Sequence, residues 1–237
     1  MRARLALAAC AVALGACHAG QTDDRAFGQR VRTYLLSHPE VIQETIDRLQ
    51  ARTDAEEAAN QRRAQADLPR LRQAIERDPR DFTANPAGKI TVTEFYDYRC
   101  PHCVNAAPKV VALIRANPDL RFVFKEMPIF GPTSEHAARD ALAVKKVGGD
   151  YLGAYAALMA ARPLDDEIAD RIARQNGAAA NDVKAYPAAD AQIRETSALF
   201  NQLHLGGTPA FIIGRQIVYG EDMDAVAAAI AKARAAG

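Results

Sequence analysis

The stretch that decides the fold is Ile90-Thr-Val-Thr-Glu-Phe-Tyr-Asp-Tyr-Arg-Cys-Pro-His-Cys103, an apolar run that ends in a Cys-x-x-Cys pair. The amphipathic residues 104–116 follow it, so the pattern predicts a strand that leads directly into a helix. Cys100 would then lie at the helix N-terminus, where free backbone N–H groups and the helix dipole stabilise a thiolate. Pro101 suits the first turn, because a proline lacks the N–H group that has no partner there.

Two cysteines at this spacing favour thiol–disulfide exchange. A thiolate attacks a disulfide, and a second cysteine three residues on can resolve the mixed disulfide. We therefore expect Cys100 to be the exposed nucleophile and Cys103 to be the buried resolving thiol. A protonated His102 would lower the pKa of Cys100 further. The alternative is half of a zinc site, but zinc usually needs four ligands, and the other two cysteines lie near the N-terminus.

The first 17 residues predict export. The basic start, Met-Arg-Ala-Arg, precedes an apolar run over residues 5–16 that is too short to span a bilayer as a stable helix. The sequence Leu14-Gly-Ala-Cys17 resembles the lipobox of bacterial lipoproteins. This resemblance implies that residues 1–16 are a removed signal peptide and that Cys17 is acylated as the mature N-terminus. An ordinary signal peptide cut after Ala19, or a plain membrane anchor, is the alternative.

Such a signal implies a periplasmic protein with a lipid anchor, in the outer membrane rather than the inner one. Cys10 would be removed with the signal peptide, and an acylated Cys17 would leave Cys100 and Cys103 as the only free thiols. Exported compartments are oxidising, which makes dithiol chemistry productive there.

The composition narrows the function classes. The chain has 237 residues, of which 49% are hydrophobic and 25% charged, and its net charge is +1. This length suffices for one domain plus extensions, and the near-neutral charge gives no case for nucleic-acid binding. No second apolar run approaches a membrane-spanning length. We expect neither a metal nor an organic cofactor.

Residues 17–81 predict a helical arm that could drive oligomerisation. Apolar residues recur at helical spacing in two helices that Ser37-His38-Pro39 separates; they are Phe27, Val31, Tyr34 and Leu35, then Val41, Ile42, Ile46 and Leu49. Pro69 is expected to start a further short helix. An exposed apolar stripe needs a partner. That partner is either the chain's own second domain or, through residues 26–66, another copy in a homo-oligomer.

Residues 82–237 predict an α/β domain. Strands are expected over 90–98 and 120–127, with a hairpin over 210–219, a closing helix, and a helical insert over about 132–204. Alternation in the first strand places Glu94 among apolar neighbours. A buried carboxylate has a raised pKa and could accept a proton beneath the dithiol. Lys125 is expected to reach Glu94, and a plain structural ion pair is the alternative.

These residues together resemble the DsbA-like branch of the thioredoxin superfamily over roughly residues 88–237. The resemblance rests on residues 94–103, on Phe122-Val-Phe-Lys-Glu-Met-Pro128, on the insert, and on Gly207-Thr-Pro-Ala-Phe211. It implies a thioredoxin fold with an inserted helical subdomain and a redox-active disulfide between Cys100 and Cys103. It also implies a cis Thr208–Pro209 bond facing the cysteines, with Thr208, Pro209 and Pro101 shaping substrate binding; a trans proline is the alternative.

The arm, with Leu35-Leu-Ser-His-Pro-Glu-Val-Ile42, resembles that of the ScsC proteins and the related Com1-like outer-membrane proteins. In that group the N-terminal helices can drive oligomerisation, and some members shuffle incorrect disulfides. The resemblance implies an exported enzyme that acts on cysteines of secreted or envelope proteins and exchanges electrons with a membrane redox partner.

The direction of the reaction stays open at this point. Thr208 before the proline and the arm favour an isomerase or reductase, whereas Cys-Pro-His-Cys favours an oxidase. A copper- or zinc-handling protein that uses Cys100, His102 and Cys103 is an alternative class, because soft thiolates suit Cu(I). An adaptor without activity is disfavoured, since both cysteines are present.

Overall fold

The computed structural model describes residues 16–184 and 186–236. The predicted signal peptide, including Cys10 but excluding its last residue, lies outside the described residues. The chain forms two compact units, residues 1–56 and 57–237.

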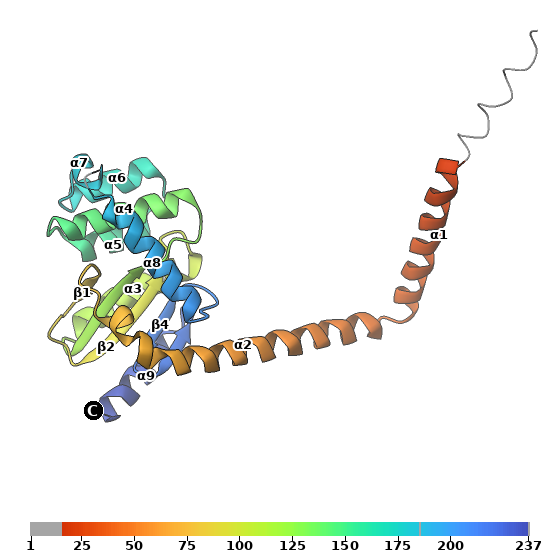
Figure 1. Ribbon diagram of the computed structural model, residues 1–237, viewed down its shortest axis with the longest axis horizontal. Coiled ribbons are helices and arrows are strands. Elements are labelled where there is room, and N and C mark those ends of the chain that lie inside the picture. Colours follow the sequence, from red (N-terminus) through yellow and green to blue (C-terminus); the bar gives the residue numbers. More distant parts are fainter. Residues whose placement is uncertain (1–15, 185, 237) are drawn as a thin grey trace, which may run out of the picture. The chain divides into compact units, whose positions relative to one another are not determined.

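The first unit contains helix α1 (Ala16–Ser37) and the beginning of helix α2 (Glu40–Glu76), labelled in Figure 1. The predicted break at Ser37-His38-Pro39 is confirmed, and the Ser37 hydroxyl there donates to the carbonyl of Thr33 at 2.9 Å. Large apolar side chains remain exposed along these helices: Phe27, Val31, Tyr34, Leu36, Ile42, Ile46 and Leu49. Within this unit the chain therefore leaves the predicted apolar stripe uncovered.

Helix α2 corrects the expectation of a separate helix that starts at Pro69. The helix runs without a break through Pro69 to Glu76. A proline inside a helix removes one backbone hydrogen bond and usually kinks or ends it. Here Leu68 and Leu71 are buried on either side of the proline while Pro69 itself faces solvent, so tertiary packing outweighs the local cost.

The second unit is built on a five-stranded mixed sheet, and the predicted α/β class is confirmed. Its strands run in the order β1-β3-β2-β4-β5. The central strands β2 (Ile90–Tyr96) and β3 (Leu120–Glu126) are parallel, and β4 (Ala210–Ile213) and β5 (Gln216–Tyr219) form the predicted hairpin. The short edge strand β1 (Phe82–Ala84), antiparallel to β3, was not predicted as a strand.

Helices connect and cover these strands. Helix α3 (Pro101–Ala116) joins β2 to β3, and α9 (Met223–Ala236) closes the chain. The insert between β3 and β4 contains α4 (Pro132–Lys146), α5 (Tyr151–Ala160), α6 (Asp166–Gln175), the unpredicted α7 (Ala180–Lys184) and α8 (Ala188–Gln202). None of the described helices combines the length and apolarity that crossing a membrane requires.

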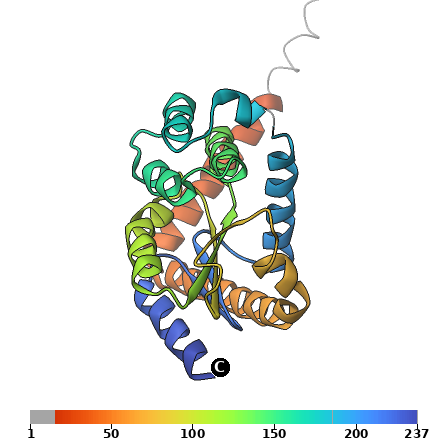
Figure 2. The ribbon, with the colours of Figure 1, turned by 90° about the vertical axis from the view of Figure 1, so that its left-hand side faces the viewer.

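The two faces of the sheet carry separate hydrophobic cores. In Figure 2, α3 and α9 lie on one side of the sheet, and α8 and the end of α2 lie on the other. Phe122 and Phe124 belong to the first core, together with residues of the insert, whereas Phe95 packs with α2 and α8 in the second. The cysteine pair lies on the α3 side.

The second core moves the predicted boundary between the arm and the α/β domain. The sequence placed that boundary between Asp81 and Phe82. The compact unit instead begins at Glu57, because Ala64, Leu68 and Ile75 of α2 are buried against the sheet. Sequence periodicity did not show that this part of α2 packs on the sheet.

Candidate active site

Cys100 is the N-cap of α3, directly after the β2 strand and a tight turn. Its backbone N–H donates to the Asp97 carbonyl at 3.2 Å, and its own carbonyl accepts from the Val104 N–H at 3.0 Å. Pro101 is the first helical residue, as predicted. The unpaired N–H groups of the first turn therefore lie at the end of the helix where Cys100 is placed.

Both cysteines are buried free thiols, with Cys100 3% exposed and Cys103 fully inaccessible. The expectation of an exposed Cys100 is therefore wrong for this structure. The cause is the loop before β4, whose Thr208 carbonyl accepts a hydrogen bond from the Cys100 thiol at 3.1 Å. This loop covers the sulfur that the helix N-terminus alone would leave open.

The pKa of Cys100 is lowered to about 5. The largest cause is a hydrogen bond from the Cys103 thiol, followed by the Thr208 side chain and the backbone N–H groups of Cys103 and His102. With the thiol protonated, the Thr208 hydroxyl has no hydrogen-bond partner among the described residues, so it is free to donate to a thiolate. Cys100 is thus ionised at neutral pH, the state in which a cysteine is nucleophilic.

The His102 ring is exposed and lies beside Glu221. Its Nδ1 atom lies 3.3 Å from a carboxylate oxygen of Glu221, at the exposed surface. The sequence predicted that the ring charge would stabilise the thiolate. In the structure the contribution of His102 to the lowered pKa of Cys100 comes from its backbone N–H, and the ring pairs with Glu221.

The Thr208–Pro209 peptide bond is cis, which confirms the expectation for this loop. The structure brings this bond beside the cysteine pair through the Thr208 contact to Cys100. A second cis bond, Arg162–Pro163 in the insert, was not predicted.

Cys103 and Glu94 form the buried side of the site. The pKa of Cys103 is raised, chiefly by burial, and the Cys100 sulfur and the charge of Glu94 add to this. Burial also raises the pKa of Glu94 to about 8, and the nearby Glu126 carboxylate opposes its ionisation. The Tyr155 hydroxyl donates to Glu94 at 3.3 Å. A carboxyl group that titrates near neutral pH therefore lies close to the resolving thiol.

Lys125 does not reach Glu94, which corrects the predicted pair. The parallel register sets Glu94 beside Phe124, so Lys125 points to the opposite face of the sheet. There its ammonium group lies 2.5 Å from Asp81 and donates to the Ala74 carbonyl at 2.6 Å. Lys125 holds the end of α2 against the sheet, and among the described residues Glu94 has no cationic partner.

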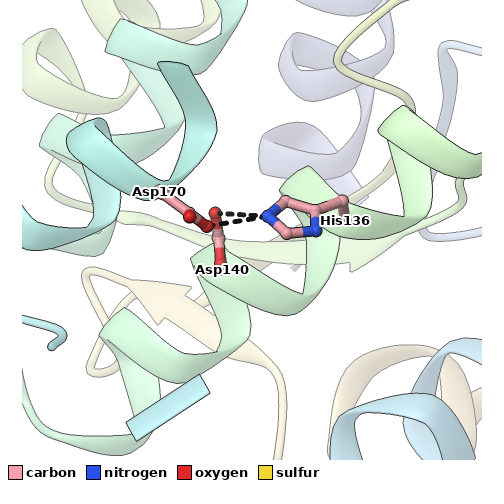
Figure 3. A group of neighbouring side chains, drawn as sticks. All are labelled: His136, Asp140 and Asp170. Atoms are coloured by element: carbon pink, nitrogen blue, oxygen red, sulfur yellow. Dashed lines mark hydrogen bonds and ion pairs between the residues drawn. The ribbon is translucent and has the colours of Figure 1, made fainter. Parts of the chain in front are cut away.

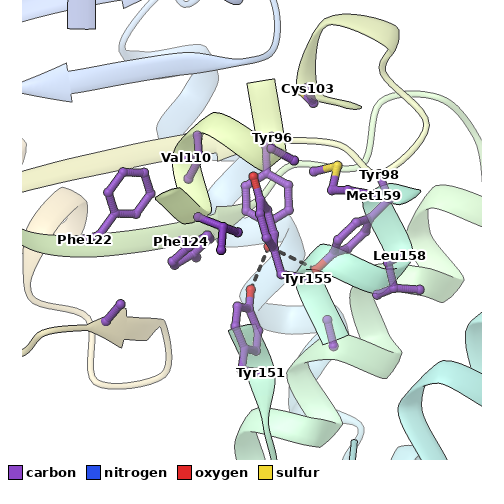
Figure 4. Packing of buried hydrophobic residues seen from close by; sticks show 14 of the residues in the cluster. Tyr96, Tyr98, Cys103, Val110, Phe122, Phe124, Tyr151, Tyr155, Leu158 and Met159 are labelled. Atoms are coloured by element: carbon purple, nitrogen blue, oxygen red, sulfur yellow. Dashed lines mark hydrogen bonds between the residues drawn. The ribbon is translucent and has the colours of Figure 1, made fainter. Parts of the chain in front are cut away.

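Glu126 is a second buried carboxyl group that sequence reasoning missed. Its Oε1 atom accepts from the hydroxyls of Tyr96, Tyr98 and Tyr151 at 2.7, 3.0 and 2.7 Å. Figure 4 shows these tyrosines and Tyr155 gathered beneath Cys103. Burial raises the pKa of Glu126 to about 8, although the three hydroxyls oppose this. The signal in the sequence was the alternation Phe122, Phe124, Glu126, which puts this carboxyl group on the core face.

Asp97 is the second functional position that sequence reasoning missed. Its carboxylate accepts four hydrogen bonds and ties the turn before Cys100 to the segment after β3. The donors are the backbone N–H groups of Arg99, Ile129 and Phe130 at 2.6, 2.6 and 2.9 Å, and the Ser134 hydroxyl at 2.8 Å. The two segments that border the cysteine pair are therefore fixed to one buried side chain.

The cysteine pair and His102 do not gather three metal-binding atoms in one place. In the part of the chain that the structure describes, the group of that kind is His136, Asp140 and Asp170, in the insert. This disfavours the alternative of a metal site made by Cys100, His102 and Cys103. A low-pKa thiolate beside a buried thiol is suited to thiol–disulfide exchange.

Two family models match the chain. The DSBA-like thioredoxin domain matches residues 91–231, and the N-terminal domain of copper resistance protein ScsC matches residues 23–56. Both agree with the resemblances expected from the sequence. No curated protein sequence matched the chain.

Solved structures agree with the family models. A thioredoxin-like oxidoreductase from Silicibacter pomeroyi DSS-3 is 34% identical, covers 70% of this chain and 99% of its own, and has a TM-score of 0.65. ScsC of Proteus mirabilis in a transitional conformation is 25% identical over 93% of this chain and 99% of its own (TM-score 0.66). A periplasmic thioredoxin-like protein from Salmonella enterica serovar Typhimurium is 26% identical over 70% and 96% (TM-score 0.60).

Proposed function

The chain belongs to the DsbA-like thioredoxin family of thiol–disulfide oxidoreductases, and we propose that it exchanges disulfides with exported proteins through Cys100 and Cys103. The observation that carries the proposal is the lowered pKa of Cys100 at the start of α3. The Cys100 thiolate attacks a substrate disulfide, forms a mixed disulfide and releases one substrate thiolate. Cys103 then attacks the Cys100 sulfur, which frees the second substrate thiol and leaves Cys100 and Cys103 oxidised.

We propose that Glu94 accepts the proton of Cys103 during this second step. Cys103 must lose its proton to attack, but burial raises its pKa. Glu94 lies on the same buried side and has no cationic partner among the described residues, and burial raises its pKa to about 8, near neutral pH. A carboxyl group whose pKa lies near the working pH can both take up and release a proton, as a general base requires.

The loop around Thr208 and Pro209 is the proposed docking site for an extended substrate segment. The loop lies against Cys100 and leads into β4, so a peptide that pairs with its backbone would present a cysteine to the thiolate. Pro101 borders the same sulfur from the start of α3.

The proposed location is the periplasm. One similar structure is described as a periplasmic thioredoxin-like protein, and the N-terminal sequence has the form of an export signal. Acylation of Cys17, an outer-membrane anchor and a membrane redox partner complete the proposal. A net reaction with substrate changes the redox state of the cysteine pair, so a redox partner must restore that state before the next reaction.

We propose the isomerase direction because of the arm. Residues 23–56 match the ScsC N-terminal domain, and the large side chains from Phe27 to Leu49 leave an apolar stripe exposed. An exposed stripe of this length favours self-association. Several active sites held together would act repeatedly on one misfolded substrate.

The oxidase direction is the second candidate, and the Cys100 pKa favours it. A strongly stabilised thiolate makes the reduced form favourable, so the disulfide form is a better oxidant. The pKa of about 5 for Cys100 lies well below that of an ordinary cysteine, near 8.5.

Recovery of scrambled, fully oxidised ribonuclease by the reduced protein distinguishes the two directions. We expect native ribonuclease activity to return, and we expect the variant Ile42→Gln/Ile46→Gln/Leu49→Gln to lose most of this activity. That variant should also have a smaller mass by light scattering, because it removes three exposed apolar side chains from the arm.

Reduction of insulin is the matched control, since it needs a single active site. The arm variant should reduce insulin as fast as the unmodified protein. The protein would be an oxidase and not an isomerase if two results are found together. The reduced form would fail to recover scrambled ribonuclease, and the disulfide form would rapidly oxidise reduced ribonuclease. An unchanged mass of the arm variant would refute the role of the stripe.

A further inference from the structure

A second cluster of chemically active side chains lies in the helical insert. His136 and Asp140 are one turn apart on α4, and Asp170 reaches them from α6 (Figure 3). The His136 Nε2 atom lies 2.8 Å from Asp170 Oδ1 and 3.6 Å from Asp140 Oδ2. One atom from each of the three side chains lies within 4.8 Å of the other two. The proposed redox reaction uses none of them.

Asp140 is the unusual member of this cluster. It is fully buried, and neither carboxylate oxygen has a hydrogen-bond partner among the described residues. A buried carboxylate without donors is costly unless a cation or a proton neutralises it. A carboxylate oxygen of Asp140 without a hydrogen-bond donor therefore lies close to His136 and Asp170.

We propose that His136, Asp140 and Asp170 bind a divalent transition-metal ion of the Zn²⁺ class. The donor set is one imidazole nitrogen and two carboxylate oxygens. Zinc binds these atom types at about 2.0–2.2 Å, whereas calcium and magnesium prefer oxygen ligands alone. The ion would supply the positive charge that both oxygens of Asp140 lack.

The surroundings of His136 fit a metal ligand. Its Nε2 atom faces the two ligand carboxylates, and its Nδ1 atom lies 3.9 Å from Asp166 Oδ2 on α6. In metal sites the second ring nitrogen commonly donates to a carboxylate, which fixes the tautomer and the ring orientation. The 3.9 Å separation is too long for that hydrogen bond, so Asp166 would have to move closer to support His136 in this way.

The site is closed on one side and open on the other. Asp140 is inaccessible, whereas the side chains of His136 and Asp170 are 29% and 42% exposed. Three protein ligands with water in a fourth, outer position complete the tetrahedral arrangement that zinc favours. A bound ion would join α4 to α6 and stabilise the insert.

Zinc titration of the disulfide form of the full-length mature protein tests this proposal. Oxidation removes both thiols, so binding at the cysteine pair cannot contribute. Calorimetry should detect one equivalent of Zn²⁺ per chain, and Zn²⁺ should raise the melting temperature, because an ion that binds only the folded state stabilises it.

Two variants and a matched control locate the ion. His136→Asn and Asp170→Asn should each weaken Zn²⁺ binding by about 100-fold or more, since even loss of a supporting residue costs about 10- to 100-fold. His204→Asn removes another exposed histidine, outside the cluster, and should bind Zn²⁺ like the unmodified protein. Asp170 is partly exposed, so Asp170→Asn remains informative if His136→Asn does not fold.

The proposal is overturned if the disulfide form binds no Zn²⁺, or if Asp170→Asn binds it with unchanged affinity. Binding by the reduced form alone would place the ion at Cys100 and Cys103 instead. None of these outcomes bears on the redox activity, which the insulin and ribonuclease assays measure separately.

Discussion

Cys100→Ser is expected to lower the rate of insulin reduction to the background of the assay. Serine cannot form a mixed disulfide, and Cys103 cannot replace Cys100 as the nucleophile, because Cys103 is buried and its pKa is raised. The measurement is the turbidity of precipitating insulin chains with excess dithiothreitol. Circular dichroism of the variant confirms that the fold is retained.

Cys103→Ser is the matched comparison, with a different expected result. Cys100 remains ionised, because the serine hydroxyl can replace the hydrogen bond from the Cys103 thiol that contributes most to its low pKa. The variant should attack substrates but fail to resolve them, so mixed disulfides should accumulate on non-reducing gels. If Cys103→Ser forms no mixed disulfide while Cys100→Ser does, the assignment of nucleophile and resolving thiol is reversed.

Asp97→Ala is expected to lower the free energy of unfolding by about 4 kcal/mol, because hydrogen bonds to a charged group are worth about 1.5–3 kcal/mol and buried N–H groups lose their acceptor. Asp97 is 1% exposed and accepts from three backbone N–H groups and from Ser134. Urea unfolding of the disulfide form measures the change and keeps the thiols from contributing.

Ser134→Ala is the control for that prediction. It removes one of the four hydrogen bonds to Asp97 and should cost about 1 kcal/mol. A loss for Asp97→Ala no larger than that for Ser134→Ala would show that the turn before Cys100 does not depend on this carboxylate.

The strands and helices near the cysteine pair were predictable because their patterns are local. A β-branched, aromatic run followed by Cys-x-x-Cys specifies β2 and the start of α3, and Gly214-Arg215 specifies the hairpin turn. Pro69 was misleading because contacts with distant residues, and not the local pattern, decide the structure there. Its local rule predicts a helix boundary, but the packing of Leu68 and Leu71 against distant residues overrides it.

The side-chain partners in the site were less predictable than the elements. Alternation along β2 correctly buried Glu94, but the position of Lys125 depends on the register between two strands. That register places Lys125 beside Phe95 and therefore on the other face. Asp97 bonds to residues more than 30 positions away, and no pattern in one sequence reports such a contact.

The burial of Cys100 also depends on a contact between residues that are far apart in the sequence. Sequence spacing places this cysteine at a helix N-terminus, which suggests exposure. The Thr208 loop, more than 100 residues later in the chain, covers it. The family resemblance predicted that this loop faces the cysteines, and the distance of 3.1 Å from sulfur to carbonyl shows how closely it packs.

Titration of the reduced protein by its thiolate absorbance in the ultraviolet tests the proposed nucleophile most directly. We expect one thiolate to form with a midpoint near pH 5, the pKa of Cys100, and we expect Cys103 to stay protonated far above neutral pH. Cys100→Ser should remove the low-pH transition. A midpoint near about 8.5, the value of an ordinary cysteine, would contradict the activation of Cys100 by the helix start, by Cys103 and by Thr208.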